Sequence, residues 1–180
     1  MLSGSGRTLL NLLSAMRGGR LHAEVGLVVA SRECAGAEHA RAAGIETVVM
    51  PGAVPAAALG SLLREHAIDW VVCAGYLSYL NVPQEYAGKV VNIHPALLPA
   101  FGGKGMYGRR VHEAVLRAGA AESGCTVHLV DEVYDHGKIL LRMTCPVLPG
   151  DTPETLAERV FALECRAYPE ALQQLIAPGV

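Results

Sequence analysis

Short apolar segments typical of strands alternate with helix-patterned segments through the first half of the chain, and this alternation constrains the fold more than any other feature. The strand-like segments are residues 24–30, 46–50, 69–74 and 89–93. The helix-like segments begin at Thr8, Cys34 and Ala56. Strands too apolar to have a solvated face, in strict alternation with helices, indicate parallel strands covered on both sides. The sequence therefore predicts an α/β fold with a single doubly wound, mostly parallel, Rossmann-like sheet.

The second half of the chain has a different pattern. After a loop rich in Pro and Gly over residues 95–108 and a helix over 110–118, two extended runs follow at 125–131 and 138–147. Only six residues separate these runs, so they are expected to pair antiparallel. Asp151 or Thr152 is then expected to cap a last long helix, with Pro153 in its first turn.

The start of the sequence leaves little room for the first strand of such a sheet. Only Met1 and Leu2 precede Ser3-Gly4, whereas a strand usually needs about five residues. A doubly wound sheet places that strand centrally. The expectation is a truncated first strand, and we favour a start codon assigned too late over a loss that the protein tolerates.

Size, charge and cysteine usage narrow the function classes. A length of 180 residues fits one domain, residues 1–180. The net charge of -2 argues against a nucleic-acid surface based on bulk charge, and no apolar run approaches the roughly 20 residues of a membrane helix. The five cysteines are an odd number without a C-x-x-C pair. Free thiols, no metal and a cytoplasmic location are therefore expected.

The glycine-rich turn Gly4-Ser5-Gly6 stands at the start of a predicted helix. Free N–H groups of a first helical turn favour an anion, and glycine lets a ligand approach the backbone closely. Arg7 and the Thr8 hydroxyl could add donors. An ordinary strand-to-helix turn explains the same residues. On this feature alone, phosphate binding and an ordinary turn are about equally supported.

Asn92 and His94 are two residues apart at the end of a predicted strand that Pro95 closes. That spacing directs both side chains to one side of the strand, at the carboxyl edge where open α/β sheets place their sites. Asp135 follows on a later loop, where a carboxylate near His94 would orient the ring and favour its protonated form. For Asn92 and His94 the structural alternative is a satisfied polar pair, which spacing alone slightly favours. For Asp135 it is a common turn Asp before Gly, which is clearly favoured when that residue is taken by itself.

The remaining candidates are weaker. Four glycines within residues 102–108 suggest a lid or a close-approach loop, or else a disordered surface loop. His128 alternates with apolar neighbours and is expected to be a partnered strand residue. His112, at the start of a helix, is expected to be structural, and His136 is a lesser candidate for the site.

Taken together, several motifs resemble the phosphoribosylglycinamide formyltransferases, a folate-dependent family of purine synthesis. The motifs run in the family's order over nearly the whole chain: S-G-S-G-R-T-L (3–9), A-G-Y-L (74–77), V-N-I-H-P-A-L-L-P (91–99), G-G-K-G-M-Y-G (102–108), C-T-V-H-L-V-D (125–131), Y-D-H-G (134–137) and P-G-D-T (149–152). The N-I-H-P-x-L-L-P block with the later D-x-G is the most specific of them, and it outweighs the structural alternatives.

The resemblance implies a role for each site residue. Its catalytic positions are Asn92, His94 and Asp135. Its substrate positions are Gly4, Ser5, Gly6, Arg7 and Thr8 for the phosphate and Glu164 for the ribose. Its folate positions are Leu77, Ser78, Tyr79, Leu80, Val130, Asp131, Glu132, Val133 and Tyr134.

The chain departs from the family at Thr8, where Asn is common, and at Cys165, where His is usual. A threonine donates one hydrogen bond where an amide donates two, which weakens the role of Thr8.

The implied reaction uses 10-formyltetrahydrofolate as co-substrate and glycinamide ribonucleotide as acceptor, without a metal. The expected partners are small molecules, with no nucleic acid and no membrane, and the protein is expected to be a monomer or a homodimer. The rival functions are methionyl-tRNA formyltransferase, formyltetrahydrofolate hydrolase and a non-catalytic folate- or nucleotide-binding module. Each rival enzyme of the wider group carries an additional domain, which is not expected here.

Overall fold

The computed structural model describes residues 1–176 and divides the chain into two compact units. The first unit is Met1–Asn92, and the second begins at Ile93. The predicted single domain of residues 1–180 extends past the described residues, and it stays a prediction. No helix within residues 1–176 is long and apolar enough to cross a membrane.

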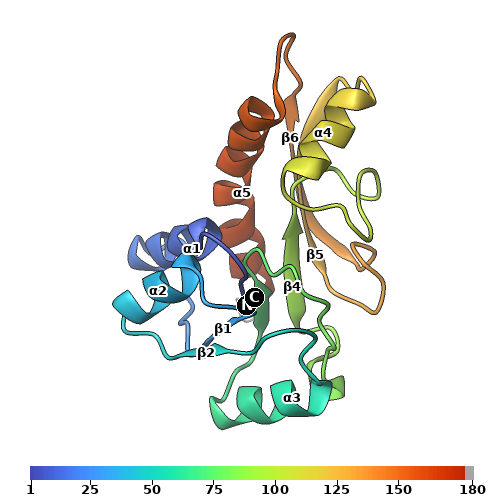
Figure 1. Ribbon diagram of the computed structural model, residues 1–180. Coiled ribbons are helices and arrows are strands. Elements are labelled where there is room, and N and C mark those ends of the chain that lie inside the picture. Colours follow the sequence, from blue (N-terminus) through green and yellow to red (C-terminus); the bar gives the residue numbers. More distant parts are fainter. Residues whose placement is uncertain (177–180) are drawn as a thin grey trace. The chain divides into compact units, whose positions relative to one another are not determined.

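The first unit follows the predicted alternation (Figure 1). Its elements are α1 (Arg7–Arg17), β1 (Val28–Ala30), α2 (Ala35–Ala42), β2 (Thr47–Val49), α3 (Ala56–Glu65), β3 (Val71–Cys73), the short 3-10 helix η1 (Gln84–Tyr86) and β4 (Val90–His94). β1 pairs parallel with β2, and β3 pairs parallel with β4. The α/β class and the parallel pairing are therefore confirmed.

The first residues of the chain lie between β1 and β3. The Leu2 N–H donates to the Val29 carbonyl at 3.0 Å, and on the other side the Met1 amine donates to the Val72 carbonyl at 2.6 Å. The Ala74 N–H donates back to Met1 at 2.7 Å. Met1 and Leu2 thus hydrogen-bond to the β1–β2 pair on one side and to the β3–β4 pair on the other, at the central position expected for the first strand.

The apolar core of this unit forms where α1 and α2 cover β1. Its buried members are Leu2, Leu9, Val28, Ala30, Ala37 and Ala40. The small alanines of α2 allow close approach, and Gly36 carries this further because a Cβ built there would lie 2.9 Å from the Gly4 carbonyl. Close packing therefore ties the start of α2 to the Gly4–Gly6 turn.

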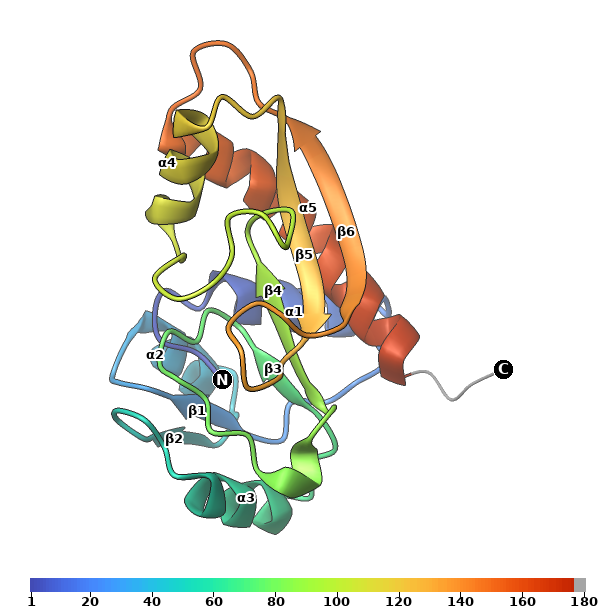
Figure 2. The same cartoon turned by 90° about the vertical axis from the view of Figure 1, so that its right-hand side faces the viewer.

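The second unit is built on an antiparallel ribbon (Figure 2). β5 (Glu122–Leu129) pairs with β6 (Ile139–Pro146), as the short connection predicts, with α4 (Arg109–Arg117) before them. The long helix α5 (Pro153–Ile176) follows and packs along the ribbon. Along β5 the side chains of Cys125 and Val127 are fully buried.

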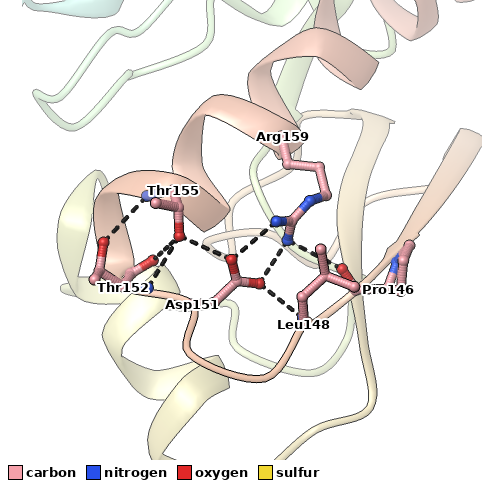
Figure 3. A network of polar contacts seen from close by, with 6 residues as sticks. All are labelled: Pro146, Leu148, Asp151, Thr152, Thr155 and Arg159. Carbon is pink, nitrogen blue, oxygen red and sulfur yellow. Dashed lines mark hydrogen bonds and ion pairs between the residues drawn. The ribbon is translucent and has the colours of Figure 1, made fainter.

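Asp151 fixes the start of α5 through a polar network (Figure 3). Its carboxylate accepts from both terminal nitrogens of Arg159, at 2.6 and 2.8 Å, and from the Leu148 N–H at 2.8 Å. Thr152 caps the first turn, because its hydroxyl accepts from the Thr155 N–H at 3.3 Å. Of the two predicted alternatives, Thr152 is therefore the capping residue, and Pro153 is the first helical residue.

We expect Asp151→Asn to lower the melting temperature by a few degrees at pH 7. The Arg159 guanidinium and the Leu148 N–H hold the pKa of Asp151 below its ordinary value. A depressed folded-state pKa stabilises the protein above the unfolded value near 4 and loses this effect as the pH falls further. Thermal unfolding at pH 7, 5 and 3 should show the gap to wild type narrowing at pH 3. Glu170→Gln, an equal charge change on α5, is the control, and a constant gap would contradict the prediction.

Candidate active site

His94 ends β4 and is buried with oxygen atoms beside both ring nitrogens. Its Nε2 lies 2.8 Å from the Phe101 carbonyl oxygen, and its Nδ1 lies 3.5 Å from Oδ2 of Asp135. A carbonyl oxygen only accepts, so Nε2 carries a proton. Nδ1 then faces the carboxylate, which would stabilise a second proton at that nitrogen.

Asp135 holds two imidazoles and one backbone amide. Its Oδ2 accepts from the Gly103 N–H at 2.9 Å, while its Oδ1 lies 3.6 Å from Nε2 of His128. The side chain is 11% exposed. The predicted pairing of His94 with Asp135 is therefore confirmed, and His128 joins it from β5.

The charge states follow from burial and from these contacts. Burial lowers the pKa of His94, although Asp135 and the Phe101 carbonyl act in the opposite direction. The Asp135 carboxylate thus acts in the predicted direction, toward the protonated form, while burial has the larger effect on the pKa of His94. Burial alone would raise the pKa of Asp135, but His128, His94 and the Gly103 N–H together lower it, so Asp135 is ionised at neutral pH.

The backbone around this pair adopts conformations that few residues tolerate. Phe101 and Asp135 have positive φ, at 57° and 55°. Asp accepts the left-handed region more readily than most residues, whereas Phe does so rarely. A Cβ at Gly137 would lie 1.9 Å from the Leu129 carbonyl, so only glycine fits after Asp135-His136. The D-x-G motif therefore has a steric basis here.

Asn92 occupies β4 two residues before His94, as predicted. Side chains alternate along a strand, so this spacing directs both to the same side of β4. Asn92 is partly buried. Its role in the site stays a prediction.

The Gly4–Gly6 turn leads into α1, which begins at Arg7 as expected. Gly6 has φ 76°, and a Cβ there would lie 2.5 Å from the Gly36 Cα, so the turn requires glycine. The first turn of α1 contains no acidic residue. Ser5 and Arg7 are exposed. Backbone N–H groups of a first helical turn and an arginine side chain thus lie together at this helix start, a setting that favours an anion.

The segment 77–80 is tied to the same turn through Ser3. The Leu77 N–H donates to the buried Ser3 hydroxyl at 2.9 Å, and the Ser3 N–H donates to the Gly75 carbonyl at 3.0 Å. Leu77 and Tyr79 are 54% and 41% exposed. Exposed apolar side chains on an anchored loop suit contact with a flat aromatic ligand.

The segment 130–134 leads directly to Asp135. Asp131 shapes it, because its carboxylate accepts from the Val133 N–H at 2.8 Å and meets Nδ1 of His136 at 2.9 Å. Val133 and Tyr134 are 58% and 45% exposed. His136 therefore pairs within the loop and does not join His94.

Two other predicted residues lie on helices of the second unit. Glu164 is a partly buried residue of α5, and its charge raises the pKa of Cys125, after the larger effect of burial. His112 is buried on α4, and its Nδ1 has no hydrogen-bond partner in the described part of the chain. The five cysteines all lie within the described residues, and no disulfide joins any two of them. No group of metal-binding side chains gathers in residues 1–176, and the absence of a metal stays a prediction.

The contribution of His128 to the Asp135 cluster was missed from the sequence. It was expected to be partnered, which is confirmed, but the partner was not anticipated. The signal was its place in C-T-V-H-L, where Gly124, Thr126 and His128 share one side of β5.

Comparison with known proteins gives a consistent result. Residues 1–172 match the family described as formyl transferase. The chain is 41% identical, over 95% of its length, to a chloroplastic phosphoribosylglycinamide formyltransferase of Arabidopsis thaliana, and it spans 62% of that protein. It is 38% identical, over 99% of its length, to the human trifunctional purine biosynthetic protein adenosine-3, of which it spans 18%.

A solved structure shares the fold. The phosphoribosylglycinamide formyltransferase of Brucella melitensis superposes with a TM-score of 0.86 at 39% identity, covering 99% of this chain and 94% of that one. The likeness covers both units of the chain and confirms the predicted fold class.

Proposed function

Because the chain belongs to the formyl transferase family, we propose that it transfers the formyl group of 10-formyltetrahydrofolate to the amine of glycinamide ribonucleotide in purine biosynthesis. The observation that carries this proposal is the buried His94–Asp135 pair, held by the Phe101 carbonyl and the Gly103 amide. The pair lies within the N-I-H-P and D-x-G motifs. Relatives that bear the phosphoribosylglycinamide formyltransferase name align with nearly the whole chain.

The chemistry begins with attack of the substrate amine on the formyl carbon. The carbonyl oxygen then becomes an oxyanion, which needs hydrogen-bond donors in a water-poor site. The Asn92 amide is one donor on β4, and His94 supplies the second once its Nδ1, the nitrogen that faces Asp135, has taken up a proton. In the free protein the Nε2 proton is held by the Phe101 carbonyl, so the ring is oriented before substrate binds.

Asp135 supports the proton movements of the reaction. The attacking nitrogen must lose a proton, and the leaving nitrogen of the folate must gain one. Asp135 is ionised and lies beside Nδ1 of His94, so it stabilises a proton taken up there. It can also pass a proton through water between the two nitrogens.

The substrates occupy the predicted binding residues. Gly4 to Thr8 bind the phosphate, and Glu164 binds the ribose. The segments 77–80 and 130–134 are the proposed folate-binding residues, and each carries exposed apolar side chains that suit contact with the pterin or its tail. We further propose that the reaction needs no metal and proceeds in the cytoplasm, where free cysteines are stable.

The decisive experiment is a turnover assay of the purified protein with 10-formyltetrahydrofolate and glycinamide ribonucleotide. Formylated product that depends on both substrates is the expected result. Formate release without the acceptor would identify a hydrolase, and formylation of methionyl-tRNA would identify the tRNA enzyme. Folate binding without any product would identify a binding module.

We expect Arg7→Ala to raise the KM for glycinamide ribonucleotide about tenfold and to change kcat by less than about twofold. Arg7 is exposed in the first turn of α1, where its charge supplements the backbone donors. Arg17→Ala, an equal charge change in the last turn of the same helix, is the control. A fall in kcat with an unchanged KM would show that Arg7 does not bind the substrate.

A further inference from the structure

Three hydrogen bonds fix the backbone that follows His94 to the β5–β6 ribbon. The Thr126 hydroxyl donates to the Ala96 carbonyl at 2.7 Å and accepts from the Leu98 N–H at 3.1 Å. The Arg142 guanidinium donates to the Leu98 carbonyl at 2.5 Å. Both side chains thus bind one short backbone segment, Ala96–Leu98.

The ribbon places these two side chains together. Thr126 of β5 and Arg142 of β6 are directly opposite each other in the antiparallel register. Gly124 lies on the same side of β5, and a Cβ there would lie 2.8 Å from a methyl carbon of Leu97. The same Cβ would lie 2.0 Å from the Met143 carbonyl oxygen of β6, so the ribbon itself requires glycine at 124, and the glycine also leaves room for Leu97 beside the strand.

The same segment continues into the groups that hold the candidate catalytic pair. The Phe101 carbonyl contacts Nε2 of His94 at 2.8 Å, and the Gly103 N–H contacts Asp135 at 2.9 Å. Residues 95–103 thus run from His94, past the Thr126–Arg142 contacts, back to both catalytic side chains. A shift of residues 95–103 would therefore displace the Phe101 carbonyl from His94 and the Gly103 N–H from Asp135.

Burial makes the Thr126 contacts specific. The residue is fully buried, and its single hydroxyl uses one donor and one acceptor function for two backbone groups. Valine has nearly the same shape but leaves the Ala96 carbonyl and the Leu98 N–H without this partner. A buried unpaired group is unfavourable, so the segment would move to find other partners.

We propose that Thr126 and Arg142 are positioning residues for catalysis, which act by holding residues 96–103 so that Phe101 and Gly103 orient His94 and Asp135. This inference rests on the proposed function for its kinetic consequence. Neither residue needs to touch a substrate. Their effect reaches the reaction through the orientation of His94.

The test compares Thr126→Val with Thr126→Ser, which keeps the hydroxyl, and with Arg142→Ala, which removes the exposed partner. Thr144→Val, the same change at an exposed position of β6, is the control. We expect Thr126→Val to lower kcat about tenfold with KM for both substrates within about twofold, because misplacing a catalytic group impairs the chemical step. Thr126→Ser should retain most of the wild-type kcat. Arg142→Ala, like Thr126→Val, should lower kcat.

A second readout follows His94 directly, by NMR titration of its imidazole in the folded variants. The Phe101 carbonyl raises the pKa of His94, so its displacement in Thr126→Val should shift the titration to lower pH. Asp135, His128 and His112 also act on this ring electrostatically, and none of them is altered in the variant.

The outcomes separate the inference from the proposed function. Wild-type kcat in Thr126→Val, or a lower kcat with an unchanged His94 titration, would overturn the positioning role. If the wild-type protein shows no formyl transfer, the proposed function fails, while the His94 titration still decides whether Thr126 positions the ring. If Thr126→Val does not fold, the exposed Arg142→Ala provides the same two readouts.

Discussion

His94→Ala should lower kcat by at least about 100-fold and leave the protein folded. The ring supplies a donor to the developing oxyanion, and loss of one such donor costs about 3 kcal/mol of transition-state stabilisation. Its orientation is already set in the free protein by the Phe101 carbonyl at 2.8 Å. Alanine cannot replace either ring nitrogen. Single-turnover kinetics with saturating substrates measures this step directly.

The matched control is His136→Ala. His136 lies next to Asp135 in the chain but pairs with Asp131, and its side chain is 72% exposed. It should keep near-normal kcat. Circular dichroism and thermal unfolding establish that both variants are folded. Near-normal turnover in folded His94→Ala would exclude His94 as a catalytic residue.

Much of the fold could be predicted because apolar patterning determines which elements form. Helices beginning at Arg7, Ala35 and Ala56 agree with the predicted starts within one residue. The strands were predicted too long, since the run 24–30 gave only Val28–Ala30. β1 pairs with β2 at only three positions. Apolar residues before Val28 have no neighbouring strand to hydrogen-bond with, so they do not extend the strand.

Part of the site could also be predicted, because strand spacing and motif order are local properties. The positions of His94 on β4 and Asp135 on the loop after β5 followed from them. The His128–Asp135 contact and the Thr126–Arg142 contacts did not, since they depend on the register between β5 and β6 and on the path of residues 95–103. The effect of burial on the pKa of His94 could not be predicted either, because it depends on how the folded chain surrounds the ring.

Asp135→Asn should lower kcat by at least about 100-fold with little change in KM, because it removes a charge and keeps the shape. The amide oxygen can still accept from the Gly103 N–H, so the loop should keep its position. What is lost is the negative charge 3.5 Å from Nδ1 of His94. Without it, a proton at that nitrogen is less stable, and transfer between the two nitrogens lacks its acceptor.

The pH dependence distinguishes this loss of charge from a structural effect of Asp135→Asn. The carboxylate raises the pKa of His94, so its removal should shift the His94 titration to lower pH than in wild type. The pKa of Asp135 itself is below its ordinary value, so the wild-type charge persists at neutral pH and is lost only as the pH falls below about 4. The difference in kcat between variant and wild type should therefore be constant from pH 8 to 6 and should narrow only in strong acid.

The control is Glu122→Gln, an exposed charge change on β5, which should leave kcat and the His94 titration as in wild type. An unchanged His94 titration in folded Asp135→Asn would mean that the carboxylate does not act through this histidine.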